Sequence, residues 1–325
     1  KEEGHAIIII THKLNEVKEI SDRVAILRKG EYITTVNTAE TNEQELTEWM
    51  VGRKIDLNID RPHMDKTRPL LELRDVSIRN DEGATAIDDV NFYIRGGEIL
   101  GVAGIAGCGQ KELCEAIAGL RPIEKGQMIH KGDNIVGLPP KQILEKGISM
   151  SFIPEDRLGM GLVGNMDITD NMMLRSYTKG KSVFLDRERP KNLAEEIIKS
   201  LKVITPNTHT PVRRLSGGNI QKILVGREIA SSPKVLMAAY PVRGLDINAS
   251  YTIYNLLTEQ KDNGVAVVFV GEDLDVLIEL CDRILVINSG KVTGIVDGRN
   301  TTKEEIGLLM TKSEKASKEE KQNEQ

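Results

Sequence analysis

Short apolar runs that alternate with helical segments constrain the fold of this chain most strongly. Helical patterns such as QKELCEAIAGL (110–120) and SYTIYNLLTEQ (250–260) lie between the runs. The runs themselves are EILGVAG (98–104), KVLMAAY (234–240), VAVVFV (265–270) and RILVI (283–287). Parallel strands need crossover connections, and strands that alternate with helices are typical of a parallel sheet covered by helices. The expected fold class is therefore α/β.

A long internal repeat constrains the domain organisation. Residues 1–52 align with residues 261–312 without a gap, and both segments have the same order of strand, helix, strand and Gly turn. The apolar run at 7–10 (IIII) aligns with VVFV at 267–270. Identical pairs include Gly4/Gly264, Asp22/Asp282, Arg23/Arg283 and Gly30/Gly290. A tandem duplication with a period of 260 residues is the economical explanation.

The repeat predicts how the chain divides. Residues 1–52 are expected to be the C-terminal remnant of a first domain, because the chain starts without Met directly before HAIIII, a pattern typical of a buried strand. Residues 69–312 are expected to form a complete second domain. It should contain a helical insertion at about 156–212, with KNLAEEIIKSLKV as an amphipathic helix. The polar segment 53–68 is expected to be a linker, and 313–325 a disordered tail.

Composition excludes several classes of protein. A net charge of -5 without a basic cluster argues against nucleic acid as a partner. The 3 cysteines fit neither a disulfide framework nor a zinc site, which indicates a reducing compartment. No apolar stretch approaches the roughly 20 residues that span a bilayer, and no signal peptide is recognisable. We therefore expect a cytosolic protein without a metal site of its own.

The turn GIAGCGQKE (104–112) has the shape of a phosphate-binding loop. Its glycines Gly104, Gly107 and Gly109 permit close approach of the backbone to a phosphate, and the following helix supplies donors and positive potential. The phosphate-binding pattern G-x-x-x-x-G-K-[ST] is broken, however, because Gln110, Lys111 and Glu112 follow. Taken alone, the motif is equally compatible with a phosphate loop and with a tight turn that binds nothing.

Two further motifs favour a nucleotide-binding domain. The first, LSGGN, precedes a predicted helix and consists of Leu215, Ser216, Gly217, Gly218 and Asn219. The second is RGLD (243–246), which ends at Asp246. In this order and spacing the chain resembles the ABC transporter nucleotide-binding domain over nearly its whole length. LSGGN resembles the signature loop and RGLD the D-loop, while GEDLD (271–275) stands where the family has its switch loop. The resemblance implies a P-loop NTPase-type fold with a helical subdomain.

Four departures from the family pattern predict a degenerate nucleotide site in the second domain. Gln110 replaces the phosphate-binding Lys, and Lys111 stands where a hydroxyl would bind Mg²⁺. Ala239 and Tyr240 replace the Mg²⁺-linked Asp and the general-base Glu, and a phenol is not a base at neutral pH. Glu272 replaces the switch His, and at about 4 Å its repulsion of a phosphate is on the order of 4 kcal/mol. We expect this site not to hydrolyse ATP.

The resemblance also implies a division of labour. ABC domains pair head to tail, so that each ATP lies between one P-loop and the other domain's signature loop. The intact loop 215–219 would thus complete the site of the first domain, where ATP and Mg²⁺ bind through ligands outside this chain. His12, within THKL in the first copy, would be the switch His of that site. A lone His would more often be a partly exposed loop residue. Ser216 and Gly218 would close over the nucleotide as donors.

Within the family, the segments SFIPEDRLGMGLV, LSGGN-x-QK and AAYPVRGLD most resemble the second half of tandem ATP-binding subunits from nucleoside importers. Simple-sugar importers are the next most similar group. Their subunits tend to keep the acidic pair that AAY lacks, which favours a nucleoside importer. The implied partners are transmembrane permease subunits, a solute-binding protein and the first ABC domain, at the cytoplasmic face of the membrane. The alternatives are a soluble tandem ABC protein, which the composition disfavours, and a regulatory pseudo-ATPase that never hydrolyses.

Two smaller features keep two interpretations each, and a third keeps one. Residues 155–157 (EDR) form either a surface turn with a local salt bridge or a segment near the loop that touches the membrane subunits. The Met-rich stretch 160–174 is either core or a docking surface. Cys108 is expected to be no more than a small residue tolerated in the glycine-rich turn.

Overall fold

The computed structural model describes residues 3–11, 14–28, 30–52, 59, 61–62, 68–145, 150–177 and 185–311. The prediction for His12, most of the predicted linker 53–68 and the whole predicted tail 313–325 lie outside the described residues. Among the helices that are described, none combines the length and the apolar character needed to cross a membrane.

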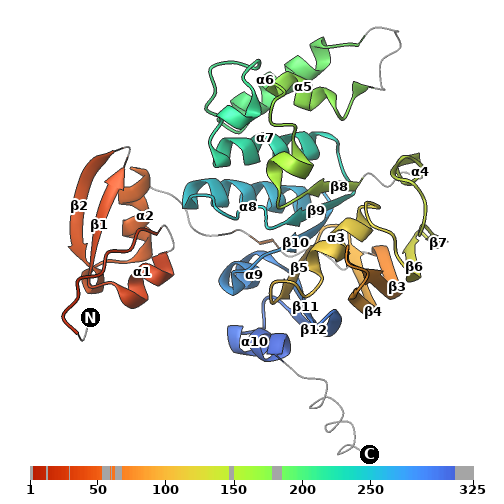
Figure 1. Cartoon of the computed structure of the whole chain (residues 1–325), viewed down its shortest axis with the longest axis horizontal. Coiled ribbons are helices and arrows are strands. Elements are labelled where there is room, and N and C mark those ends of the chain that lie inside the picture. The colour runs from red at the N-terminus through yellow and green to blue at the C-terminus, as the bar shows by residue number, and fades with distance from the viewer. Residues whose placement is uncertain are drawn as a thin grey trace, which may run out of the picture.

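A six-stranded sheet forms the centre of the structure after residue 68, which we call the second unit (Figure 1). Five of its strands are parallel and the edge strand β12 is antiparallel. In spatial order the strands are β12 (Lys291–Asp297), β11 (Arg283–Asn288), β5 (Ile99–Gly104), β10 (Ala266–Val270), β9 (Val235–Ala239) and β8 (Met150–Ile153). β9 and β10 are buried at every position, because a parallel sheet is covered on both faces. The predicted α/β fold is confirmed.

A second, antiparallel sheet packs against one face of the central sheet. Its order is β4 (Thr85–Arg95), β3 (Pro69–Arg79), β6 (Lys125–His130) and β7 (Asp133–Asn134). Alternate side chains of β5 enter different cores: Leu100 and Val102 pack with this sheet and with α3 (Gln110–Ile117). Ile99 and Ala103 face the core on the other side. A short helix, α4 (Pro140–Glu145), follows this sheet in the chain.

Helices cover the other face of the central sheet and continue into a helical region, green in Figure 1. The helices on the sheet are α7 (Gly217–Ala230), α8 (Ile247–Asp262) and α9 (Leu274–Leu280), and α10 (Lys303–Thr311) follows β12. The helical region contains a turn of π-helix (Arg157–Gly161), α5 (Ile168–Met173), α6 (Glu188–Ser200) and a 3-10 turn (Val212–Arg214). In the Met-rich stretch Met172 is buried, whereas Met160 and Met166 are exposed, so the stretch is partly core and partly surface.

The N-terminal segment repeats the last four main elements of the chain. α1 (Leu14–Ile20), β1 (Arg23–Arg28), β2 (Glu31–Asn37) and α2 (Glu43–Val51) begin and end 260 residues before α9, β11, β12 and α10. A short 3-10 turn (Thr38–Glu40) lies between β2 and α2. The two hairpins even share one irregularity, which falls at Ile26/Leu27 and at Val286/Ile287. The segment has a small core of its own around Leu14, Ile26 and Leu46.

One expectation about the N-terminal segment is wrong. The run Ile7–Ile10 aligns with the buried strand β10 but belongs to no strand here, and its side chains are 56–98% exposed. A strand needs a neighbour that accepts and donates its backbone hydrogen bonds. β10 lies between β5 and β9, and the described residues place no strand beside residues 7–10.

Candidate nucleotide site and signature loop

The glycine-rich turn connects β5 to α3 at the carboxyl end of the central sheet. Gly107 and Gly109 have φ angles of 87° and 100°, a region that L-residues rarely adopt. A Cβ at Gly109 would also lie 2.4 Å from Ala86 O. The sequence therefore needs glycine at position 109 for both reasons.

The side chains after the turn make contacts within the chain itself. Gln110 is only 2% exposed, and its Nε2 donates to Ile105 O at 3.1 Å, inside the turn. Lys111 is more than half exposed and forms an ion pair with Glu115, one helical turn further on, at 3.8 Å. Glu112 lies in the first turn of α3 and is half-buried. The position after Gly109 thus holds a neutral amide, and the ammonium of Lys111 is paired along the helix.

An ion-pair network lies where the next three strands of the sheet end. Ala239 ends β9 with no polar side-chain atom, and Tyr240 follows it at a φ of 49°, which is unusual for an aromatic residue. The Arg243 guanidinium lies 5.9 Å from the Tyr240 ring centroid. Arg243 forms an ion pair with Glu155, and its Nη2 is 3.6 Å from Glu272 Oε1.

These residues do not fit a magnesium nucleotide. The turn carries no cation at position 110, and the residue that ends β9 has no oxygen ligand. In the part of the chain that the structure describes, no three His, Cys, Asp or Glu side chains are grouped so that they could hold a metal ion. The glycine-rich turn keeps its backbone shape without the side chains for this chemistry.

We expect the free energy of unfolding to fall as the pH rises above about 9. Burial, followed by the charges of Glu272 and Glu155, raises the pKa of Tyr240 from 10.0 to about 12. Burial likewise raises the pKa of Tyr251 from 10.0 to about 12 and that of Cys114 from 9.0 to about 12. The folded chain keeps these protons where the unfolded chain has lost them, so their contribution is complete below pH 9 and is lost towards pH 12. Urea midpoints measured between about pH 8 and pH 11 check this, and an unchanged midpoint would contradict it.

The predicted signature loop, residues 215–219, overlaps the start of α7, whose first residue is Gly217. Ser216 is the N-cap residue, yet its side chain does not cap the helix. Its Oγ accepts a hydrogen bond from Asn219 Nδ2 at 3.0 Å, and Asn219 Oδ1 accepts from Ile204 N at 3.1 Å. Since Oγ is the acceptor in this pair, its own proton remains available for donation to an acceptor outside the chain. The first N–H groups of a helix lack intrahelical acceptors, so the loop has the donors of an anion site.

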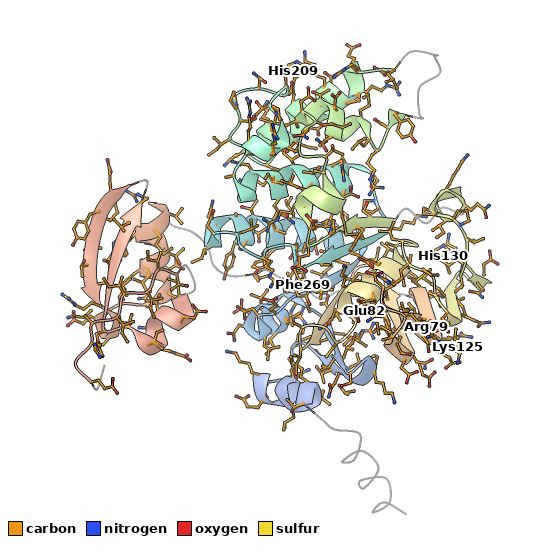
Figure 2. The ribbon with its side chains drawn as sticks, in the orientation of Figure 1. Arg79, Glu82, Lys125, His130, His209 and Phe269 are labelled. Atoms are coloured by element: carbon orange, nitrogen blue, oxygen red, sulfur yellow. The ribbon has the colours of Figure 1, made fainter. Side chains whose placement is uncertain are left out.

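A cavity of about 680 Å³ borders the signature loop. Its lining includes Leu215, Ser216 and Asn219 on the loop, and Ile204, His209 and Arg214 beside it. Figure 2 shows His209 at the outer end of the helical region, far from Arg79 and Lys125 on the antiparallel sheet. The intact motif thus has open space beside it that is lined by both polar and apolar groups.

Asp246 starts the helix that follows β9. Its Oδ1 accepts a hydrogen bond from Ala249 N at 2.9 Å, which makes it the N-cap of α8. Leu245, just before it, lies close to Gly217, since a Cβ at Gly217 would be 3.9 Å from Leu245 Cδ2. The structure therefore brings residues 243–246 and the signature loop together, whereas the sequence shows only their order along the chain.

Sequence reasoning missed the part played by two arginines. The sequence presents Arg243 only as a letter of the RGLD motif, and Arg157 as part of a segment that is either a surface turn with a local salt bridge or lies near the loop that touches the membrane subunits. The acid of that turn, Glu155, instead pairs with Arg243, which is 88 residues away. Asp156 caps the π-helical turn by accepting from Gly159 N at 2.8 Å. Charged residues directly after neighbouring strands were the available signal, because such positions meet at one edge of a parallel sheet.

Comparisons with known proteins show what this chain is similar to. Residues 87–241 match the model described as ABC transporter. The glucose import ATP-binding protein TsgD13 of Haloferax volcanii is 38% identical over 315 residues, which cover 95% of this chain and 57% of that protein. The nucleoside import ATP-binding protein NupA of Lactococcus lactis is 37% identical over 311 residues, covering 95% and 61%. The chain thus spans about three fifths of the length of these relatives.

Solved structures agree in fold. The dimeric ATP-binding cassette MJ0796 bound to ADP and Pi has a TM-score of 0.61 at 22% identity, covering 71% of this chain and 100% of that one. An ATP-binding subunit of an ABC transporter has a TM-score of 0.62 at 20% identity, covering 75% and 100%. The central sheet, the antiparallel sheet and the helices described above are those of an ABC ATPase domain. The chain therefore has the fold of an ABC ATPase domain and is similar in sequence to sugar and nucleoside import ATP-binding proteins.

Proposed function

We propose that this chain is the second half of the energy-coupling ATP-binding subunit of a nucleoside importer. Its own nucleotide site is degenerate, and its signature loop completes the ATP site of a first ABC domain. The observation that carries the proposal is the contrast between the two loops. Ser216 keeps a free donor next to an open cavity, whereas Gln110 fills the turn where a cation is needed.

The internal repeat supports a first domain. Residues 1–52 have the elements of residues 261–312 with the same bounds, as expected for the C-terminal end of a preceding ABC domain. Residues 53–68 would link the two domains, and residues 69–312 would be the degenerate second domain with its helical insertion. The relative NupA is longer than this chain, which leaves room for such a domain.

The residues of this chain would act on a nucleotide that the first domain holds. ATP would bind there, with Mg²⁺ held by ligands outside this chain, and would supply the hydrolysable phosphate. Ser216 Oγ and the N–H of Gly218 would donate to the charge that develops on that phosphate, and His12 would contact it from the first domain's side. Closure of the two halves would then move permease subunits that receive substrate from a solute-binding protein, at the cytoplasmic face of the membrane.

Simple sugars are the second candidate substrate class. The glucose import relative is as similar to this chain as the nucleoside import relative, at 38% against 37% identity. Retention of labelled nucleosides or sugars by the companion solute-binding protein distinguishes the two classes. Retention of sugars alone would overturn the nucleoside assignment and leave the rest of the proposal standing.

Calorimetric titration of this chain with ATP, with and without Mg²⁺, tests the degenerate site. We expect a Kd of about 1 mM or weaker that Mg²⁺ does not strengthen, and no phosphate release, because the site lacks both a cation and metal ligands. Tight binding that depends on Mg²⁺, followed by turnover, would show that another residue restores the site. The proposed division of labour would then be wrong.

A further inference from the structure

Arg243 joins the loops that follow three neighbouring strands. It lies in the loop after β9, while Glu155 follows β8 and Glu272 follows β10. The guanidinium pairs with both carboxylates and lies over the ring of Tyr240. These three loops are thereby connected by side chains of the chain itself.

Arg157 connects the same network to the signature loop. Its Nη2 donates a hydrogen bond to the backbone carbonyl of Arg243. Its Nη1 lies against Gly217, where a Cβ would be 3.4 Å away. Among the described residues no carboxylate pairs with Arg157, and partial burial lowers its pKa. The half-buried guanidinium is therefore held by a backbone carbonyl, and this hydrogen bond fixes the position of the Arg243 backbone relative to Arg157.

The contact has a defined consequence for residues 243–246. This loop begins at the carbonyl that Arg157 holds and ends at Asp246, which caps α8. Leu245, in the middle of the loop, also packs near Gly217. The loop is thus fixed at its start, at its middle and at its end, and two of these three contacts lie beside the signature loop.

We propose that Arg157 is a positioning residue that holds the loop 243–246 against the signature loop, and that Arg243 anchors this contact through its ion pairs with Glu155 and Glu272. The network links the degenerate site to the loop that serves the other domain, so that this half keeps its shape without a bound nucleotide. The catalytic consequence rests on the proposed function, whereas the structural link does not.

The exposure of the ion pairs decides which property responds to mutation. The side chains of Arg243 and Glu272 are each 56% exposed, and exposed ion pairs contribute little to stability. Loss of the network should therefore leave global unfolding nearly unchanged and instead loosen the local geometry. Catalysis is sensitive to such changes, because small displacements of positioned groups lower turnover more than binding.

Two measurements on one set of variants test the proposal. The variants are Arg157→Ala, Arg157→Lys and Arg243→Ala, with Arg74→Ala as the control, since Arg74 is an exposed arginine that pairs with Glu72 on the antiparallel sheet. In this chain, hydrogen exchange at Ile220, whose N–H donates to Ser216 O, and at Leu245, whose N–H donates to Val242 O, should accelerate about tenfold in the two network Ala variants and stay unchanged in the control. Arg157→Lys should restore most of the protection, because an ammonium can also donate to the carbonyl.

The second measurement is ATP turnover in a subunit in which a complete first ABC domain precedes this chain. We expect Arg157→Ala to lower kcat about tenfold with little change in KM. Unchanged exchange in Arg157→Ala would overturn the structural link. A raised KM with unchanged exchange would mean that Arg157 contacts the phosphate directly, which also overturns it. Faster exchange in the variants, together with a parent subunit that shows no turnover at all, would uphold the link and refute the proposed function.

Discussion

Replacing Ser216 with Ala should lower ATP turnover by about 10²- to 10³-fold in a subunit that has a complete first ABC domain. The change removes the hydroxyl that Asn219 orients and whose proton is free for donation. A donor aimed at developing charge acts mainly in the transition state, so kcat should fall while KM for ATP changes little. Single-turnover phosphate release with labelled ATP measures this directly.

The matched control is Ser231→Ala at the other end of α7. Ser231 Oγ donates to Glu228 O within the same helix, so the variant removes one hydroxyl far from the signature loop. Its turnover should stay within about twofold of the parent, as for most substitutions away from a site. If Ser216→Ala also keeps full turnover, the chain acts as a scaffold and the proposed division of labour fails.

The strands of the central sheet could be predicted because they depend on local patterns. The apolar runs at 98–104, 234–240, 265–270 and 283–287 became β5, β9, β10 and β11, since a strand buried on both faces needs apolar side chains at every position. The repeat predicts that residues 1–52 form the same elements as residues 261–312, and these are α1, β1, β2 and α2. Each copy closes its hairpin with a Gly at positive φ, Gly30 in the first and Gly290 in the second. Each of these features depends on a short stretch of sequence.

The ion-pair network could not be predicted, because it depends on which strands are neighbours. Glu155, Arg243 and Glu272 are separated by many residues and meet only because β8, β9 and β10 lie side by side. The expected repulsion between Glu272 and a phosphate assumes an unpaired carboxylate. In the structure the Glu272 carboxylate forms an ion pair with Arg243. The prediction of a buried strand at Ile7–Ile10 is wrong for the same reason. Burial of a strand depends on neighbouring strands, which a local sequence pattern does not reveal.

Replacing Lys261 with Met should destabilise the second unit by about 3 kcal/mol, the lower end of the range for breaking a buried ion pair. The Lys261 side chain is fully buried, and its Nζ donates to Asp282 Oδ1 at 2.8 Å and to Pro62 O at 2.9 Å. Met fills a similar volume, so the loss is electrostatic and does not come from a cavity. The Asp282 carboxylate also accepts from Ile99 N at 2.9 Å and cannot turn away to solvent without losing that bond.

A double variant separates the ion pair from packing. Lys125→Met, which removes an exposed lysine on β6, should stay within about 0.5 kcal/mol of the parent in urea unfolding. Combining Lys261→Met with Asp282→Asn removes both charges. The double variant should therefore lose less free energy of unfolding than the two single variants lose in sum. Additive effects would mean that Lys261 acts by packing alone. The same ammonium donates to Pro62 O, and Arg61 donates to Ile278 O at 2.8 Å, so residues 61–62 are held against the second unit by two polar contacts.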